Sequence, residues 1–269
     1  MDGLNFRISF IFALIIILLI VTGCGTSGPA GALQPCYNTK TECVEELPEF
    51  AEIKDVNEKK TTFFNLLHPM VNDANRKVLI QRSKALELFK LPVAELEEED
   101  REWLLEISEA FNLEVDDIQA VYQSKEVLLK RLDVVPPSLA LAQAANESGW
   151  GSSRFAREAN NLYGQWCFTE GCGFIPKNRK DGLKHEVRKF DSVNESVFSY
   201  VRNINKHQAY QQLRTYRATL RQSKGQFSGS ELAQGLSNYS ERGEEYIKEI
   251  RSMIRTNKLS RFDSEFWNN

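Results

Sequence analysis

Residues 136–166 read "PPSLALAQAANESGWGSSRFAREANNLYGQW", and the fold prediction starts from this stretch. A helix should begin near Pro137, because proline suits the first helical turn and the Ala, Leu and Gln residues that follow favour helix. Gly149 and Gly151 should end it. Glu147 then lies in the last turn, where the helix dipole disfavours a negative charge. Stability alone does not explain a glutamate at this position.

Composition places the chain among ordinary globular proteins. It has 269 residues, of which 42% are hydrophobic and 26% charged, enough for one or two domains. The 34 Lys and Arg residues and 37 Asp and Glu residues leave a net charge of -3. This charge lacks the positive bias that binds phosphate backbones, so nucleic acid is not an expected partner.

The N-terminus has the pattern of an export signal. Arg7 precedes an unbroken apolar run over residues 8–21, which is shorter than the roughly 20 residues that cross a bilayer. The following "IVTGC" resembles a bacterial lipobox, in which Cys24 would receive lipid and become the new N-terminus. A plain secretory signal with an incidental cysteine is the alternative. Residues 1–23 are therefore predicted to be a lipoprotein signal peptide.

The predicted location follows from the same segment. Gly25, rather than Asp, follows Cys24, which by resemblance to lipoproteins of enteric-type bacteria favours the outer membrane. We expect an exported protein that is lipid-anchored there and faces the periplasm. Residues 24–60, whose first part is rich in Gly, Pro, Thr and Ser, are predicted to be a tether.

The cysteines agree with export. The chain has 5 cysteines, and lipidation of Cys24 leaves two short-range pairs, Cys36 with Cys43 and Cys167 with Cys172. The second pair is predicted to be a disulfide, whereas the first could equally hold free thiols. These pairs suit an oxidising compartment. The cysteine spacing is not that of a zinc knuckle and the chain has only 3 histidines, so no metal is expected.

The rest of the chain is patterned mainly as helices. Residues 61–130 carry apolar positions at helical spacing on both sides of Pro69. Residues 167–190, with glycines and a turn-like "NRKDG", suggest a small β-hairpin before helices resume. The fold class is therefore mainly α. Whether residues 61–130 form a separate module, and whether the two prolines at 136–137 act as a hinge or only begin a helix, stays open.

Four ordered motifs carry a family resemblance. "AANESGWG" at 144–151 and "NNLYG" at 160–164 resemble the glucosaminidase family, glycoside hydrolase family 73. "RKFDSVNESVFSYV" at 188–201 and "NYSERGEEYIKEI" at 238–250 resemble its later motifs. The similarity covers about residues 131–259, so a glucosaminidase domain is predicted over residues 131–262. It is strongest to the bacterial Bax-like proteins, which also have a preceding helical segment.

The resemblance implies a lysozyme-like domain with a small β-hairpin. It implies an endo-beta-N-acetylglucosaminidase that cleaves the β-1,4 bond after N-acetylglucosamine in peptidoglycan. Glu147 would be the general acid, because a carboxyl at the negative end of a helix beside an indole should have a raised pKa. It would protonate the leaving oxygen. The implied partners are peptidoglycan glycan strands and, through the lipid, the membrane; no cofactor is expected.

The resemblance also implies further site residues. Tyr239 matches a tyrosine near the scissile bond in relatives, and an ordinary buried tyrosine is the alternative. Trp150 could equally be a core indole, and Trp166 could stack on a sugar or support the hairpin. The expected substrate-binding residues are Trp150, Asn161, Tyr163, Trp166 and Tyr246.

The second catalytic carboxylate is the point of departure from the family. A glutamate on the hairpin often serves there as base or stabiliser, but "GCGFIP" at 171–176 has no acid. Glu170, Asp181 and Glu186 lie within reach along the chain, and Glu186 is the predicted substitute. If no carboxylate lies roughly 5 to 10 Å from Glu147, the acetamido group of the substrate would assist or activity would be weak.

Two other functions compete. A lytic transglycosylase would also use one glutamate in this fold, but its G-L-M-Q stretch is absent and "NLYGQW" stands in its place. A noncatalytic cell-wall-binding lipoprotein would keep the cleft without turnover. The sequence has no phosphate-binding glycine loop and no recognisable Cys or Ser nucleophile motif with a histidine partner.

Overall fold

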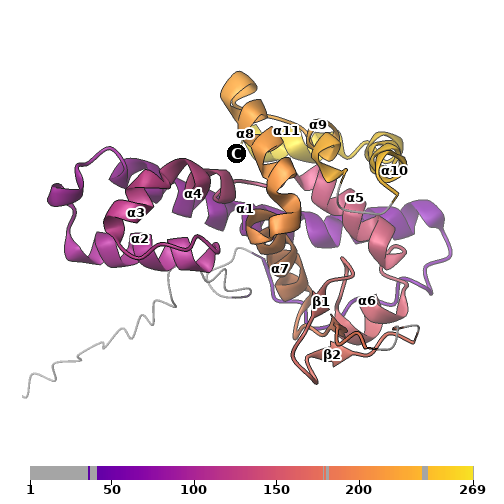
Figure 1. The fold of residues 1–269 in the computed structure, drawn as a ribbon. Coiled ribbons are helices and arrows are strands. Elements are labelled where there is room, and N and C mark those ends of the chain that lie inside the picture. The colour runs from indigo at the N-terminus through magenta and orange to yellow at the C-terminus, as the bar shows by residue number, and fades with distance from the viewer. Residues whose placement is uncertain (1–35, 37–40, 178, 180–181, 238–241, 269) are drawn as a thin grey trace, which may run out of the picture.

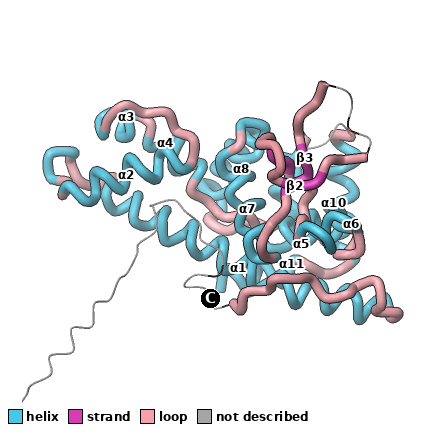
Figure 2. The backbone as a smooth tube through the Cα atoms, turned by 90° about the horizontal axis from the view of Figure 1, so that it is seen from below, coloured by secondary structure: helices cyan, strands magenta, loops and turns pink. Residues whose placement is uncertain are grey.

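A computed structural model of the chain describes residues 36, 41–177, 179, 182–237 and 242–268 (Figures 1 and 2). The elements in chain order are α1 (Val56–Leu88), η1 (Val93–Glu95), α2 (Glu98–Ala110), α3 (Ile118–Gln123), α4 (Lys125–Arg131), α5 (Pro137–Ser148), α6 (Arg154–Ala159), β1 (Trp166–Cys167), β2 (Gly173–Phe174), β3 (Glu186–Arg188), α7 (Val193–Lys206), η2 (Gln208–Tyr210), α8 (Gln211–Lys224), α9 (Gly229–Leu232), η3 (Ala233–Leu236), α10 (Glu244–Thr256) and α11 (Ser260–Asn268). The mainly α fold class with a small β element is confirmed. Across these described stretches, none of the helices combines the length and apolar composition that a membrane span requires.

Helix α1 connects two hydrophobic cores. Its first half packs into the larger core with α5, α7, α10 and α11, through side chains such as Phe63 and Val71. Its last turns, with Ala85 and Leu88, belong to a smaller core under α2, α3 and α4. Figure 1 shows these three helices together at the left, away from the strands. The region predicted as 61–130 is therefore shared between two cores rather than forming one separate module.

Pro69 lies inside α1 and does not end it. Proline removes one helical hydrogen bond and crowds the preceding turn, which in isolation disfavours the helix. Buried apolar side chains on both sides, including Phe64, Leu67, Met70 and Val71, hold the two halves against the same core. We infer that this burial offsets the cost of the proline, so that α1 continues through it.

The segment before α1 is packed, which corrects the expectation of a tether over residues 24–60 for its described part from Val44 onward. Phe50 is 0% exposed and lies against Gly151, where an added Cβ would be only 2.6 Å from the ring. The backbone N–H of Val44 donates to Oδ1 of Asn194 at 2.9 Å. The disulfide between Cys36 and Cys43, left open by the sequence, is formed in the structure.

Side chains from α1 and α8 hold the segment that precedes α5 in place. Asn75 of α1 pairs with both backbone groups of Val135, accepting from its N–H at 2.9 Å and donating to its carbonyl at 2.7 Å. Arg221 of α8 binds the Asp133 carboxylate with two nitrogens. Arg217 donates to the backbone carbonyls of Asp133 and Val134. These contacts fix the chain before the two prolines, so the hinge alternative is not supported.

Helix α11 secures the start of α5. The carboxylate of Asp263 accepts hydrogen bonds from the Ser138 backbone N–H at 2.8 Å, the Ser138 hydroxyl at 2.6 Å and the Gly229 N–H at 3.0 Å. Phe262 and Phe266 are buried in the larger core. The folded unit therefore extends beyond residue 262, the boundary expected from the sequence.

The predicted hairpin region forms a small antiparallel sheet with strand order β1-β3-β2. Val187 of β3 pairs with Trp166 on one side and Phe174 on the other. The disulfide between Cys167 and Cys172 closes the loop between β1 and β2, as predicted. The sheet presents Trp166 at the surface.

Candidate active site

A sharp turn follows Glu147 at the end of α5. Gly149, Trp150 and Gly151 all have left-handed backbones, with φ angles of 56°, 60° and 73°. Glycine accepts this conformation at little cost, but a bulky residue such as Trp150 rarely adopts it. The N–H of Trp150 bonds to the Ala145 carbonyl at 3.0 Å. The two glycines therefore end the helix as the sequence predicted, and leave Glu147 at its exposed tip.

The carboxyl of Glu147 is tuned by its surroundings. The residue is exposed at the surface, yet protein atoms around the carboxyl group partly desolvate it, and this burial raises its pKa. Hydrogen bonds from the side chains of Tyr246 and Asn146 favour the ionised form and act in the opposite direction. The charge of Glu249 raises the pKa, and that of Arg242 lowers it. The net effect is a raised pKa, so Glu147 keeps its proton to a higher pH than an ordinary glutamate.

A directional hydrogen-bond chain leads to Glu147 through three buried side chains. The Tyr200 hydroxyl of α7 donates to the Gln143 side-chain carbonyl at 2.5 Å. The Gln143 amide donates to the Tyr246 hydroxyl at 3.0 Å. The Tyr246 hydroxyl donates to Glu147 Oε1 at 3.0 Å. Gln143 and Glu147 are four residues apart and share one face of α5, so the helix itself aligns the chain.

This geometry changes the role expected for Tyr246. The sequence analysis expected Tyr246 to contact substrate directly, but its side chain is buried and its hydroxyl lies between Gln143 and Glu147. Tyr246 therefore positions and tunes the carboxyl group rather than presenting a surface to a ligand.

The sequence analysis missed three side chains near Glu147, namely Glu249, Arg242 and Tyr210. Glu249 lies three residues after Tyr246 on α10 and forms an ion pair with Arg242 at 2.8 Å. Burial and the charge of Glu147 raise the pKa of Tyr210 to about 12, which places its hydroxyl in the same electrostatic environment. Helical spacing from Tyr246 could have identified Glu249. No local pattern marks Tyr210, which follows α7 in the 3-10 turn η2.

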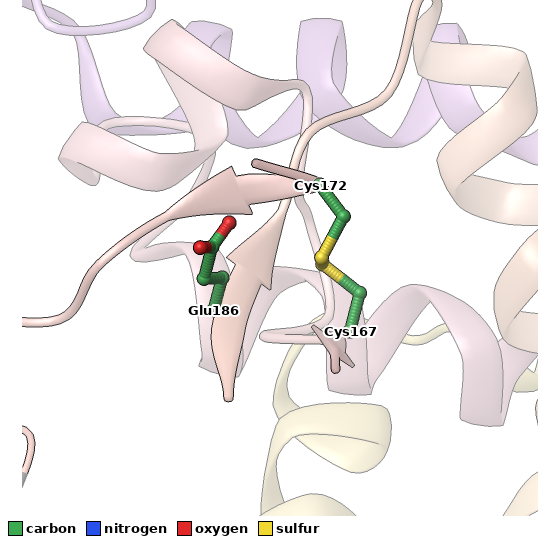
Figure 3. A group of neighbouring side chains, drawn as sticks. All are labelled: Cys167, Cys172 and Glu186. Carbon is green, nitrogen blue, oxygen red and sulfur yellow. A yellow bond between two sulfur atoms is a disulfide. The ribbon is translucent and has the colours of Figure 1, made fainter. Parts of the chain in front are cut away.

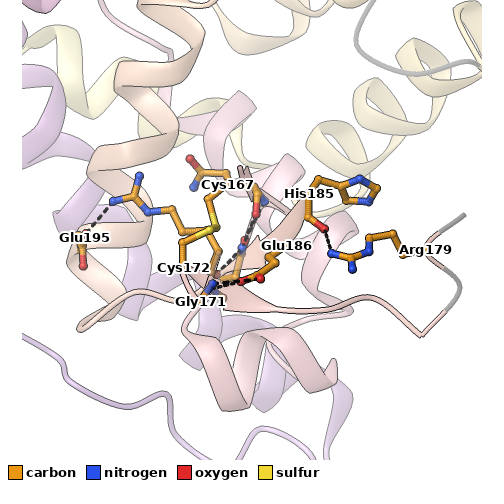
Figure 4. The surroundings of a disulfide bond; sticks show 11 residues. Cys167, Gly171, Cys172, Arg179, His185, Glu186 and Glu195 are labelled. Carbon is orange, nitrogen blue, oxygen red and sulfur yellow. Dashed lines mark hydrogen bonds and ion pairs between the residues drawn. A yellow bond between two sulfur atoms is a disulfide. The ribbon is translucent and has the colours of Figure 1, made fainter. Parts of the chain in front are cut away.

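Both carboxylate oxygens of Glu186, the predicted second carboxylate, accept hydrogen bonds within the hairpin. Glu186 is 5% exposed, and its two oxygens accept hydrogen bonds from the backbone N–H groups of Gly171 at 3.1 Å and Gly173 at 2.8 Å (Figure 4). Gly173 must be glycine, because an added Cβ would lie 1.9 Å from the Val187 carbonyl oxygen. The structure thus gives Glu186 a bracing position and disfavours it as a catalytic base.

The same carboxylate lies beside the hairpin disulfide. The Sγ atoms of Cys167 and Cys172 and a carboxylate oxygen of Glu186 all lie within 4.8 Å of one another (Figure 3). The two sulfur atoms are bonded to each other, so they offer no thiolates to a metal ion. This group is therefore a cross-linked loop rather than a metal site.

Asn161 and Tyr163 support the site from inside. The Asn161 amide donates to the carbonyls of Gln165 at 2.8 Å and Arg188 at 2.9 Å, and its oxygen accepts from the Gln165 N–H. The Tyr163 ring stacks on Tyr200, with centroids 3.9 Å apart. Both side chains are buried. The expectation that they contact substrate is corrected: they fix the loop before β1 and the tyrosine that starts the hydrogen-bond chain.

The two candidate tryptophans have different surroundings. Trp150 packs edge-on against Phe63 and Phe64 of α1, with centroids 5.9 and 5.3 Å away, which favours its packing interpretation. Trp166 is 58% exposed and stacks on the His185 ring at 4.0 Å. His185 covers one face of the indole, and the exposed remainder of the side chain is available to a ligand. Two further expected residues, Tyr239 and Cys24, lie outside the described residues.

Comparison with known proteins finds a family and a relative that this chain resembles. Residues 123–259 match the family described as "Glucosaminidase: Mannosyl-glycoprotein endo-beta-N-acetylglucosaminidase". The chain is 28% identical over 232 residues to "Protein bax" of Escherichia coli (strain K12), covering 82% of this chain and 78% of that protein. No solved structure matches the chain. The matched region contains α5, the small sheet and α10.

Proposed function

Since the chain belongs to the glucosaminidase family, we propose that it is a glycoside hydrolase that cleaves the β-1,4 bond after N-acetylglucosamine in peptidoglycan. One observation carries the proposal. Glu147 lies at an exposed helix end with a raised pKa and an oxygen held by Tyr246. A general acid needs a raised pKa and a fixed position, and the pKa of this carboxyl is shifted in that direction while Tyr246 holds one of its oxygens.

In the proposed reaction Glu147 protonates the glycosidic oxygen as it leaves. The carbon–oxygen bond breaks while the sugar gains oxocarbenium character, and the pair of bonding electrons goes to the oxygen that receives the proton. The resulting carboxylate is stabilised by the hydrogen bonds from Tyr246 and Asn146, which favour the ionised form. Proton transfer of this kind contributes roughly 10²- to 10⁴-fold in rate.

The reaction also needs a group that stabilises the sugar cation, and Glu186 is not that group. Because the hairpin amides occupy both oxygens of Glu186, we propose that the carbonyl oxygen of the substrate's acetamido group bonds to the sugar cation. A water molecule then breaks this bond, leaving its hydroxyl on the sugar carbon and giving its proton to the Glu147 carboxylate. Glu249 is the carboxylate whose charge acts on Glu147, but it is already paired with Arg242. We assign it an electrostatic role rather than that of a nucleophile or base.

The engagement of Glu186 also supports one different class of function. A cell-wall-binding protein without turnover would keep the acid but lack a competent second carboxylate. A lytic transglycosylase, the other alternative, would use the same acid and close an anhydro ring on the sugar.

Product analysis separates the three functions. Purified murein is digested with the full-length protein, and the released fragments are identified by mass spectrometry. We expect fragments that end in reducing N-acetylglucosamine. Anhydro sugars would replace this proposal with a transglycosylase, whereas binding without release would replace it with a cell-wall-binding protein.

We also propose that the protein is exported and anchored by lipid at Cys24. The lipobox-like "IVTGC" and the two disulfides support this location. After expression with a radiolabelled fatty acid, the protein should carry the label. Membrane fractionation should find it in the outer membrane. Cys24→Ser should lose the label, and a labelled Cys24→Ser protein would contradict the anchor.

A further inference from the structure

A polar cavity of about 330 Å³ lies between the small sheet and α7. Trp166 and Arg188 line it from the sheet, and Glu195, Arg202 and Lys206 line it from α7. Glu147 is not among its lining residues. Nothing in the proposed proton transfer uses this cavity.

The charges in the cavity are unbalanced. Arg188 pairs with Glu195 at 3.3 Å, and the other Glu195 oxygen accepts from the Asp191 N–H at 2.9 Å. This one carboxylate is therefore already engaged. Arg202 and Lys206 have no acidic partner among the lining residues. An anion entering the cavity would meet two cations that lack a counter-charge.

Burial of Arg202 and Lys206 raises the free-energy cost of their unpaired charges. The Arg202 Nε is buried without a hydrogen-bond partner in the described part of the chain. Desolvation lowers the pKa of Arg202, and the charge of Arg188 lowers it further. Desolvation and the charges of Arg202 and Arg188 together lower the pKa of Lys206. A bound anion would satisfy these donors and relieve the repulsion between like charges.

The cavity is preorganised. The Ser199 hydroxyl donates to Gln165 Oε1 at 2.8 Å, and the Gln165 amide donates to the Ser196 carbonyl at 3.1 Å. These bonds tie α7 to the loop before β1. Trp166 stands beside them and stacks on His185. A ligand would therefore meet the two cations and the indole without reordering the loop.

We propose that this cavity binds a carboxylate of the peptide carried by peptidoglycan, with Arg202 and Lys206 holding the anion and Trp166 contacting the adjacent apolar part. The inference rests on the proposed function and extends it to specificity. N-acetylglucosamine itself has no charge and gives buried cations no partner, and the lactyl carboxyl of the neighbouring N-acetylmuramic acid is held in an amide bond while the peptide is attached. The peptide attached to the glycan ends in carboxylates, which guanidinium and ammonium groups recognise. The protein should therefore prefer peptide-bearing strands to bare glycan.

A binding experiment tests this preference without turnover. Full-length Glu147→Gln protein is sedimented with intact murein and with murein whose peptides have been removed enzymatically. We expect binding to intact murein to be roughly tenfold tighter, as for a hydrogen-bonded charged group. Adding Arg202→Gln and Lys206→Gln should abolish this difference, whereas the control pair Lys125→Gln and Arg255→Gln should retain it.

Competition and folding controls complete the design. Free stem peptide should displace the protein from intact murein, while the same concentration of inorganic phosphate should not. Equal displacement by phosphate would overturn the peptide assignment in favour of a general anion site. Thermal unfolding midpoints are compared across the variants, and Lys206→Gln alone is used if the double variant does not fold.

The outcomes distinguish this inference from the proposed function. Equal binding of intact and stripped murein would overturn the peptide site while cleavage by the wild-type protein persists; if the cavity substitutions weaken both, the anion is the lactyl carboxylate of the stripped glycan instead. Failure to bind either form, together with no cleavage by the wild-type protein, would overturn the proposed function and the peptide site together.

Discussion

The Tyr246 hydroxyl on α10 donates a hydrogen bond to Glu147 Oε1 at the end of α5, with 3.0 Å between the oxygens. The phenol oxygen accepts from Gln143 at the same time, so its single proton is directed at the carboxyl group. This bond favours the ionised carboxylate, whereas burial favours the protonated acid. The pH range over which Glu147 can act as an acid depends on their balance.

Tyr246→Phe removes the bond and should raise the pKa of Glu147 further. A general acid works while protonated, so activity falls as pH rises through its pKa. The alkaline limb of kcat/KM against pH should therefore move to higher pH. An alkaline limb that stays in place in this variant would contradict the tuning role of Tyr246.

Glu249→Gln should have the opposite effect. Its negative charge raises the pKa of Glu147, so removing it lowers that pKa and moves the alkaline limb to lower pH. Arg242→Gln is the matched control and should move the limb upward. If Glu249→Gln instead lowers the rate by orders of magnitude at every pH, Glu249 takes part in the chemistry.

Glu186→Gln tests the bracing role of this carboxylate. Glutamine keeps one acceptor oxygen for the amides of Gly171 and Gly173 but loses the charge-assisted bonds. We expect murein cleavage to remain within about tenfold of wild type, well short of the loss of a general acid or base. Limited proteolysis should cut the loop between β1 and β2 faster. A loss of activity with no change in proteolysis would restore Glu186 as a catalytic candidate.

Asp133→Asn should destabilise the fold. Burial alone raises the pKa of Asp133, but the charge of Arg217, the hydrogen bond and charge of Arg221 and the charge of Arg82 outweigh it, so the pKa is lowered. Removing the charge leaves buried arginines uncompensated, at a cost of about 3 kcal/mol in the free energy of unfolding. Urea unfolding at neutral pH measures this difference.

The effect of Asp133 should depend on pH in one direction. Its lowered pKa stabilises the folded protein above the ordinary aspartate pKa, and this stability is lost as pH falls through the folded value. Wild type and Asp133→Asn should therefore converge in acid. Asp100→Asn, which breaks a partly exposed pair with Lys84, should cost at most about 1 kcal/mol. Equal losses from both substitutions at neutral pH would contradict the account.

The sequence predicted those elements that local signals determine. Pro137 and Gly149 bound α5 because one suits a first helical turn and the other accepts a left-handed backbone. The packed N-terminal segment could not be predicted in this way. Phe50 is buried because Gly151, about a hundred residues later, leaves room for its ring.

The same distinction applies to the site. Glu147 stands out because its motif places a carboxylate at an unfavourable helix end. Glu186 was chosen by distance along the chain, but the register of β3 directs its oxygens to the hairpin amides. The link from Tyr200 to Gln143 joins two helices, so only their packing brings these side chains together.

The central claim is that Glu147 supplies the proton, and a comparison of turnover with binding tests it most directly. Full-length wild-type and Glu147→Gln proteins are compared for release of reducing sugar from murein and for sedimentation with it. We expect Glu147→Gln to lose roughly 10²- to 10⁴-fold in rate while binding is retained. A Glu147→Gln protein that cleaves murein at the wild-type rate would contradict the account.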